Sequence, residues 1–118
     1  MATSGVRARF NLRLSKGGVK AIGPGKIALL EAIEQTGSIS AAARHLGMSY
    51  RRAWGLVDEL NRILVKPAVE ANVGGRHGGR ATLLPTGRRL ATLYRAIERD
   101  AARKTAAATR NLLKLLAK

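Results

Sequence analysis

Three apolar-patterned segments separated by single glycines constrain the fold of this chain more than any other feature. Between residues 26 and 64, apolar side chains recur at spacings of three and four, which is the period of a helix face. Gly37 and Gly47 interrupt the pattern at points where helices commonly end. The pattern therefore predicts three helices, over residues 26–36, 39–46 and 50 to about 64.

The junctions between these helices predict a helix-turn-helix. Ser38 and Ser49 directly precede the second and third helices, where a side-chain oxygen caps the free N–H groups. The short turn "LGMS" contains Gly47, which lets the chain reverse between the two helices. In this motif the second helix of the pair enters the major groove of DNA by its N-terminal end. Here that end reads Ser49, Tyr50, Arg51 and Arg52, and an arginine can bind a guanine edge bidentately.

The stretch "NVGGRHGGRATL" predicts a β-hairpin with a basic, glycine-rich tip. It lies between two short β-prone runs, residues 68–73 and 81–84. A hairpin directly after a recognition helix is a wing, and its cations can hold phosphates or enter a minor groove. An ordinary flexible loop is the alternative that the glycine content alone favours. The helix-turn-helix before it favours the wing, which would contribute Gly75, Arg76, His77 and Arg80.

The two ends of the chain carry simpler patterns. Residues 6–14 alternate apolar and polar side chains, which predicts a half-buried strand, and residues 15–25 are expected to form a loop. After Pro85 a long helix is expected, with a seam that resembles a coiled coil. Either this seam pairs two copies, or only its first turns pack and the rest frays. The expected dimerisation residues are Leu90, Tyr94, Ile97, Leu112 and Leu115.

Composition narrows the function classes. The 118 residues carry 22 Lys and Arg against 7 Asp and Glu, a formal charge of +15, so the chain attracts polyanions. It has no cysteine and two histidines, and no catalytic arrangement or metal site is expected. No signal peptide or bilayer-spanning run is visible, so we expect the protein in the cytoplasm, at the nucleoid. Because no catalytic site is visible, we do not expect an enzyme. We expect no cofactor.

These patterns together predict a mainly α protein with a small β-hairpin, a winged helix-turn-helix followed by a long C-terminal helix. The expected divisions are a strand and loop (1–22), the winged helix-turn-helix (23–87) and a dimerisation helix (88–118). The partner would be double-stranded DNA. Charge alone also fits a sequence-independent nucleoid or RNA-binding protein, and the fold also fits an adaptor that binds protein. The expected DNA-binding residues are Ser38, Ser40, Arg44, Ser49, Tyr50, Arg51, Arg52, Gly75, Arg76, His77 and Arg80.

Two stretches, "TGSISAAARHLGMSYRRAWGLVDELN" and "GGRHGGRATLLPTGRRLATLYRAIE", resemble the N-terminal DNA-binding domain of the ModE-type molybdate-responsive regulators. The resemblance covers about residues 6–100, and a more distant one links the region to LysR-type regulators. It implies a dimeric winged helix-turn-helix on a palindromic operator, with genes of molybdenum or related metal uptake as targets. It also implies dimerisation through the long helix and the N-terminal segment.

The chain departs from the family pattern in three ways. His77 and Arg80 stand where the wing usually has glycine, and Leu84 replaces a usual capping threonine, so we expect the cap to shift to Thr86. Full-length members carry C-terminal molybdate-binding domains, whereas this sequence ends at Lys118, shortly after the long helix. Molybdate or a related oxyanion is therefore implied only by the resemblance.

Overall fold

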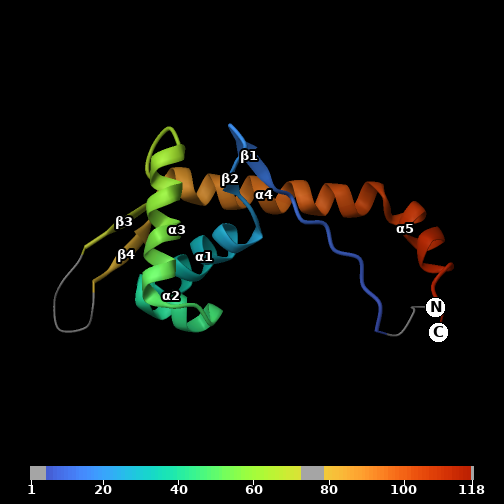
Figure 1. Ribbon diagram of the computed structural model, residues 1–118, viewed down its shortest axis with the longest axis horizontal. Helices are drawn as coiled ribbons and strands as arrows, with labels where there is room; N and C mark the ends of the chain where they lie inside the picture. Colours follow the sequence, from blue (N-terminus) through green and yellow to red (C-terminus); the bar gives the residue numbers. More distant parts are fainter. Residues whose placement is uncertain (1–4, 73–78, 118) are drawn as a thin grey trace.

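Three helices and two β-hairpins form the body of the molecule, and a long helix extends from it. The computed structural model describes residues 5–72 and 79–117. The elements in chain order are β1 (Leu14–Lys16), β2 (Val19–Ile22), α1 (Pro24–Thr36), α2 (Ile39–Leu46), α3 (Tyr50–Ile63), β3 (Val69–Ala71), β4 (Ala81–Leu83), α4 (Pro85–Lys104) and α5 (Ala106–Leu113). This arrangement confirms the mainly α, winged helix-turn-helix class (Figure 1).

The core lies where α1, α2 and α3 meet. The largest fully buried side chains come from α1 and α3, and they are Ile27, Leu29, Leu30, Ile33, Val57 and Leu60. Removing side chains of this size from water stabilises a fold by roughly 1.5–3 kcal/mol each. The α1 prediction missed its first two residues, because Pro24 occupies the first turn, where a missing N–H costs nothing.

The predicted capping of α2 and α3 is confirmed. The Ser38 hydroxyl accepts a hydrogen bond from the Ala41 N–H at 2.9 Å, and the Ser49 hydroxyl accepts one from the Arg52 N–H at 3.1 Å. Gly37 and Gly47 follow α1 and α2 with φ of 75° and 69°, in the left-handed conformation. These local contacts fix the boundaries of the helix-turn-helix.

The predicted strand over residues 6–14 is wrong for all but its last residue. Residues 6–13 run alongside α4 without a strand partner (Figure 1), and the Tyr94 hydroxyl donates to the Leu12 carbonyl at 2.6 Å. An alternating pattern suits a strand only where another strand supplies its hydrogen bonds. The segment therefore lies extended on a helix instead.

The predicted loop over residues 15–25 contains a β-hairpin. Leu14–Lys16 pairs antiparallel with Val19–Ile22 through the two-residue turn Gly17–Gly18. Both glycines have positive φ, 59° and 81°, which a tight hairpin turn of this length demands. The Gly-Gly pair was a usable hairpin signal in the sequence.

The long C-terminal helix is interrupted. Leu84, not Thr86, is the N-cap of α4, so the expected shift of the cap is wrong. At Thr105 the backbone leaves helical geometry, with φ −106° and ψ 8°, and α5 begins afterwards. The Thr105 hydroxyl donates to the Ala101 carbonyl at 2.6 Å. Such a bond to the preceding turn is known to bend helices.

Candidate nucleic-acid interface

One side of α3 is buried in the core and the other is exposed to solvent. Ala53, Val57 and Leu60 are buried against the core, whereas Arg51 and Arg52 are exposed. The Ser49 hydroxyl that caps this helix still has its proton, which it can donate to an anion. The helix therefore presents two guanidinium groups at its N-terminal end, as the sequence predicted.

Tyr50 and Trp54 form a rigid pair beside these arginines. Their rings meet edge to face, with centroids 6.3 Å apart and an interplanar angle of 74°. The Trp54 indole N–H donates to the Tyr50 hydroxyl, and Trp54 packs partly buried against the core. The Tyr50 ring is 48% exposed, so it remains available to a ligand.

The wing is fastened to the helical body at its base. β3 and β4 pair in register, with Val69 opposite Leu83, and the Ala81 N–H donates to the Gly37 carbonyl at 2.9 Å. Asn61 of α3 accepts from the N–H groups of Ala68 and Val69 at 2.8 and 3.2 Å, and donates to the Val69 carbonyl at 3.0 Å.

The sequence analysis missed Asn61, although a polar side chain on the core side of an amphipathic helix, just before a strand, was a usable signal. It fixes the wing relative to the recognition helix.

Gly87 was missed as well. A Cβ at this position would lie 2.5 Å from the Ala68 carbonyl oxygen and 2.7 Å from Leu83. Only glycine lets α4 approach the base of the wing this closely. A glycine in the first turn of a helix, where no cap requires it, was the available signal.

The structure brings three of the predicted DNA-binding residues together. A small hollow between α2, α3 and the base of the wing is lined by Ser40, Tyr50 and Arg80, among other residues. Arg44 is exposed one turn along α2 and donates to the Ser40 hydroxyl at 3.4 Å. Ser38 serves as the cap of α2. Gly75, Arg76 and His77 lie outside the described residues.

The acidic side chains are mostly engaged away from this face. In the part of the chain that the structure describes, the carboxylates of Glu31 and Glu34 bind α4 arginines, at 2.6 and 2.7 Å. None of the ion pairs within that part involves Arg44, Arg51, Arg52 or Arg80. Their positive charge is therefore available to an anionic partner.

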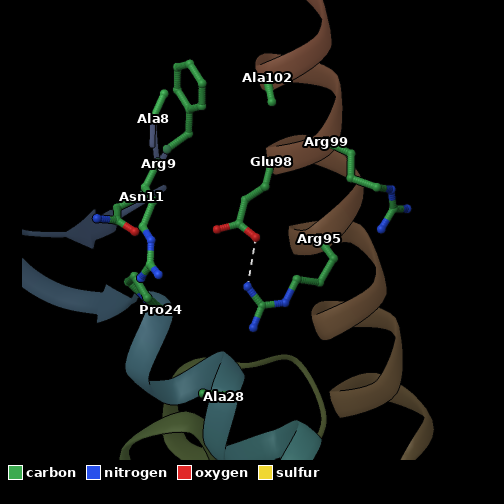
Figure 2. A pocket seen from close by; sticks show the side chains of 10 residues that line it. Ala8, Arg9, Asn11, Pro24, Ala28, Arg95, Glu98, Arg99 and Ala102 are labelled. Atoms are coloured by element: carbon green, nitrogen blue, oxygen red, sulfur yellow. Dashed lines mark hydrogen bonds and ion pairs between the residues drawn. The ribbon is translucent and has the colours of Figure 1, made fainter. Parts of the chain in front are cut away.

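The α1–α4 contact is held by Arg95. It binds Glu31 at 2.6 Å and Glu98 at 2.8 Å, and these hydrogen bonds raise its pKa above the ordinary value, so it stays charged. Figure 2 shows Glu98 and Arg95 joined beside a hollow of about 490 Å³ between α4 and residues 8–11. The N-terminal segment thus leaves open space against α4.

The predicted dimerisation residues differ in exposure. Tyr94 is buried within the chain and Leu90 is partly buried, so both contribute to intrachain packing. The other three are exposed, with 50% of Ile97, 61% of Leu112 and 81% of Leu115 accessible to solvent.

Two further findings concern metal ligands and membrane-crossing helices. Within residues 5–72 and 79–117, histidine and acidic side chains form no group of three that could hold a metal ion. In the same ranges, none of the helices combines the length and the apolar character needed to cross a bilayer.

The chain is similar to three named proteins over most of its length. It is 49% identical over 82 residues to the molybdenum-pterin-binding protein MopB of Rhodobacter capsulatus. It is 42% identical over 91 residues to the molybdenum transport protein ModE of Azotobacter vinelandii. It is also 42% identical over 71 residues to the DNA-binding transcriptional dual regulator ModE of Escherichia coli K12. The chain is a homologue of the ModE-type regulators.

The resemblance read from the sequence is therefore confirmed. The three matches cover 70%, 77% and 60% of this chain, but only 30%, 33% and 27% of MopB and the two ModE proteins. The chain thus spans about a third of these relatives. No protein-family model matches it. ModE-type homologues bear names of transcriptional regulators rather than of enzymes.

Proposed function

We propose that this chain is a sequence-specific DNA-binding transcriptional regulator. The observation that carries the proposal is the exposed N-terminal end of α3, where Arg51 and Arg52 have no carboxylate partner among the described residues. This end lies beside the base of a wing, in the arrangement that places a recognition helix in a major groove. Arg51 would read base edges, and Arg44 and Arg80 would bind phosphates.

The division of labour follows the fold. Residues 23–87 would form the DNA-binding unit, and residues 88–118 would supply the dimerisation helix. Before them, an extended segment over residues 6–13 leads into the β1–β2 hairpin. A dimer is supported by the apolar side chains of Ile97, Leu112 and Leu115, which are at least half exposed among the described residues. A two-fold symmetric dimer would bind a palindromic operator.

The first experiment is selection of bound duplexes from a random DNA pool at moderate salt, with and without molybdate. An enriched inverted repeat supports a sequence-specific dimer. The absence of enrichment, with binding that falls uniformly as salt rises, would instead support a nucleoid or RNA-binding protein. Regulation of molybdenum-related genes is supported by the names of the relatives. A molybdate effect on selection would show that this chain itself responds to the oxyanion.

Two substitutions test the assigned residues. Arg51→Ala should relax base preference, costing about 1–3 kcal/mol on the operator and less on random DNA. Equal losses on both would exclude base reading by Arg51. Leu112→Asp should lower the mass measured by light scattering toward that of a monomer, and an unchanged mass would remove Leu112 from the dimer interface.

A further inference from the structure

We propose that Arg13 and Arg52 form a second phosphate-binding site for DNA, on the flank of α3 opposite the wing. This inference deepens the proposed function and rests on it. It assigns to the N-terminal segment a contact with the DNA backbone, and it separates the roles of the two neighbouring arginines of α3.

The site is a hollow of about 500 Å³ between four parts of the chain. Arg13 comes from the segment that leads into β1, and Ile22 closes β2. Gly23 and Gly25 flank the start of α1 and add no side chain to the hollow. Arg52, Leu56 and Glu59 of α3 form the remaining wall, with Lys26 beside them.

The charges around the hollow leave it positive. The Lys26 ammonium is bound on both sides, by the Glu59 carboxylate at 3.0 Å and by the Ala21 carbonyl at 2.8 Å. The charges of Lys26 and Glu59 therefore cancel. The guanidinium groups of Arg13 and Arg52 take part in none of the ion pairs among the described residues, and both side chains are exposed. Two guanidinium groups facing one hollow suit a phosphate, which arginine binds strongly.

The space beside Arg13 is open to a ligand. The Arg13 guanidinium lies against the backbone of Gly23, where its Nη1 is 3.6 Å from the position that a Cβ would take. A Cβ at Gly25 would meet no atom within 4 Å. The hollow that Arg13 lines together with Arg52 has a volume that a phosphate group can enter.

The helical period places this hollow on the far side of α3 from the wing. At about 100° per residue, Arg52 and Glu59 lie roughly 140–180° around the helix from Tyr50 and Trp54, which face the wing. Arg51 falls between the two flanks, on the most exposed side. Figure 1 likewise shows the β1–β2 hairpin and the wing on opposite sides of α3.

The dimensions of DNA place a phosphate backbone on each side of an inserted helix. A helix with side chains is about 10–12 Å across, and the major groove is about 12 Å wide, so one phosphate backbone lies on each flank. The wing serves one backbone, and Arg13 with Arg52 serves the other. Arg52 is then a backbone contact, which differs from the sequence-based expectation that both arginines read bases.

The test compares Arg13→Ala with Lys104→Ala, a control that removes one exposed charge far from α3. Binding to the selected operator and to a random duplex is measured as a function of salt. Arg13→Ala and Arg52→Ala should weaken both duplexes by the same factor and lower the salt slope by about one charge per protomer. Lys104→Ala should leave the slope unchanged, and Arg13→Lys should restore most of it.

A second measurement uses operators in which single flanking phosphates are replaced by neutral methylphosphonates. Where the contacted phosphate is neutral, wild type should bind the operator more weakly than the unmodified one. The Arg13→Ala variant, which already binds more weakly, should bind both operators equally. The proposal is overturned if no flanking phosphate shows this coupling, or if Arg52→Ala changes the selected sequence as Arg51→Ala does. If inorganic phosphate or molybdate protects Arg13 from an arginine-modifying reagent, but no flanking phosphate of DNA shows the coupling, the hollow binds a free oxyanion instead.

Failure of this site is distinguishable from failure of the proposed function. If wild type selects no operator but Arg13→Ala and Arg52→Ala still lower the salt slope on random DNA, the second phosphate site stands and the regulator proposal falls. If wild type selects an operator without the coupling, the regulator proposal stands and this site falls. Unfolding curves of Arg13→Ala should stay close to those of wild type, because the Arg13 side chain is exposed and forms none of the ion pairs within the described residues.

Discussion

The helical body and the two chain extensions, the N-terminal segment and the end of the chain around α5, differ in how far their apolar side chains are buried. In the body, apolar side chains such as Leu30, Ile33 and Val57 have at most 1% of their surface exposed. In the extensions, Phe10, Leu112 and similar side chains remain 37% and 61% exposed. The same apolar patterning thus gives a closed core in one region and an uncovered surface in the other.

The difference indicates which parts of one copy of the chain can bury their own apolar side chains. The body buries its apolar side chains between α1 and α3, and it holds the wing through the hydrogen bonds of Asn61 and the close approach at Gly87. The N-terminal segment is fastened at Leu12 but leaves a hollow of about 490 Å³ beside α4. Uncovered apolar surface of this kind marks interaction sites in other proteins, and a partner chain would cover it in the proposed dimer.

The largest expected effect contrasts one leucine from each region. Leu30→Ala should lower the free energy of unfolding by about 2–5 kcal/mol, because it opens a cavity in the core. Leu112→Ala should lower it by less than about 0.5 kcal/mol at concentrations where the chain is monomeric. Denaturant unfolding measures both. A comparable loss for the two variants would place α5 within the cooperative core and remove the contrast.

Gly87→Ala tests the junction between the body and α4. We expect a loss of about 1–3 kcal/mol, since the added Cβ would press on the Ala68 carbonyl and shift the wing. Gly55→Ala is the matched control, because a Cβ there meets nothing within 4 Å, and alanine should stabilise this exposed helix by up to about 1 kcal/mol. Thermal unfolding of the two variants should move in opposite directions, and a stabilised Gly87→Ala would refute the close contact.

Asn61→Ala tests the attachment of β3 to α3. The N–H groups of Ala68 and Val69 lose their acceptor in a buried setting, so we expect a loss of about 1–3 kcal/mol and a weaker contribution of the wing to DNA binding. Asn72→Ala, an exposed position on the same hairpin, should stay within about 0.5 kcal/mol of wild type. Equal stabilities for the two variants would show that the wing does not depend on Asn61.

Tyr94→Phe tests the attachment of the N-terminal extension. It removes the hydrogen bond to Leu12, so we expect a loss of about 0.5–1.5 kcal/mol and faster amide exchange in residues 6–13. Unchanged exchange there would show that other contacts hold the segment.

The same contact has a pH dependence. Burial, followed by the nearby Glu98 charge, raises the pKa of Tyr94 above its ordinary value of 10.0. Folding therefore favours the protonated hydroxyl, so its contribution to stability is complete below pH 10 and is lost as pH rises through the folded pKa. Wild type should lose more stability than Tyr94→Phe in that alkaline range, and parallel curves would contradict this.

Elements fixed by local contacts were predictable from the sequence. The bounds of α2 agree with the prediction residue for residue, and those of α3 to within one residue, because serine hydroxyls and left-handed glycines define helix ends within a few positions along the chain. The exposed position of Arg51 follows from the same helical period. The interruption at Thr105 was within reach too, since its bond to Ala101 is local.

Other features depend on residues far apart in the sequence. The alternating pattern of residues 6–13 specifies an extended chain, but whether a strand or α4 lies beside it is decided by tertiary packing. The grouping of Arg13 with Arg52 around one hollow arises only when the segment before β1, β2 and α3 come together in the fold. The helix-turn-helix and its charged face follow from the sequence, because local hydrogen bonds and the helical period of the side chains suffice for them. What flanks the recognition helix follows from the fold, because it depends on contacts between segments distant along the chain.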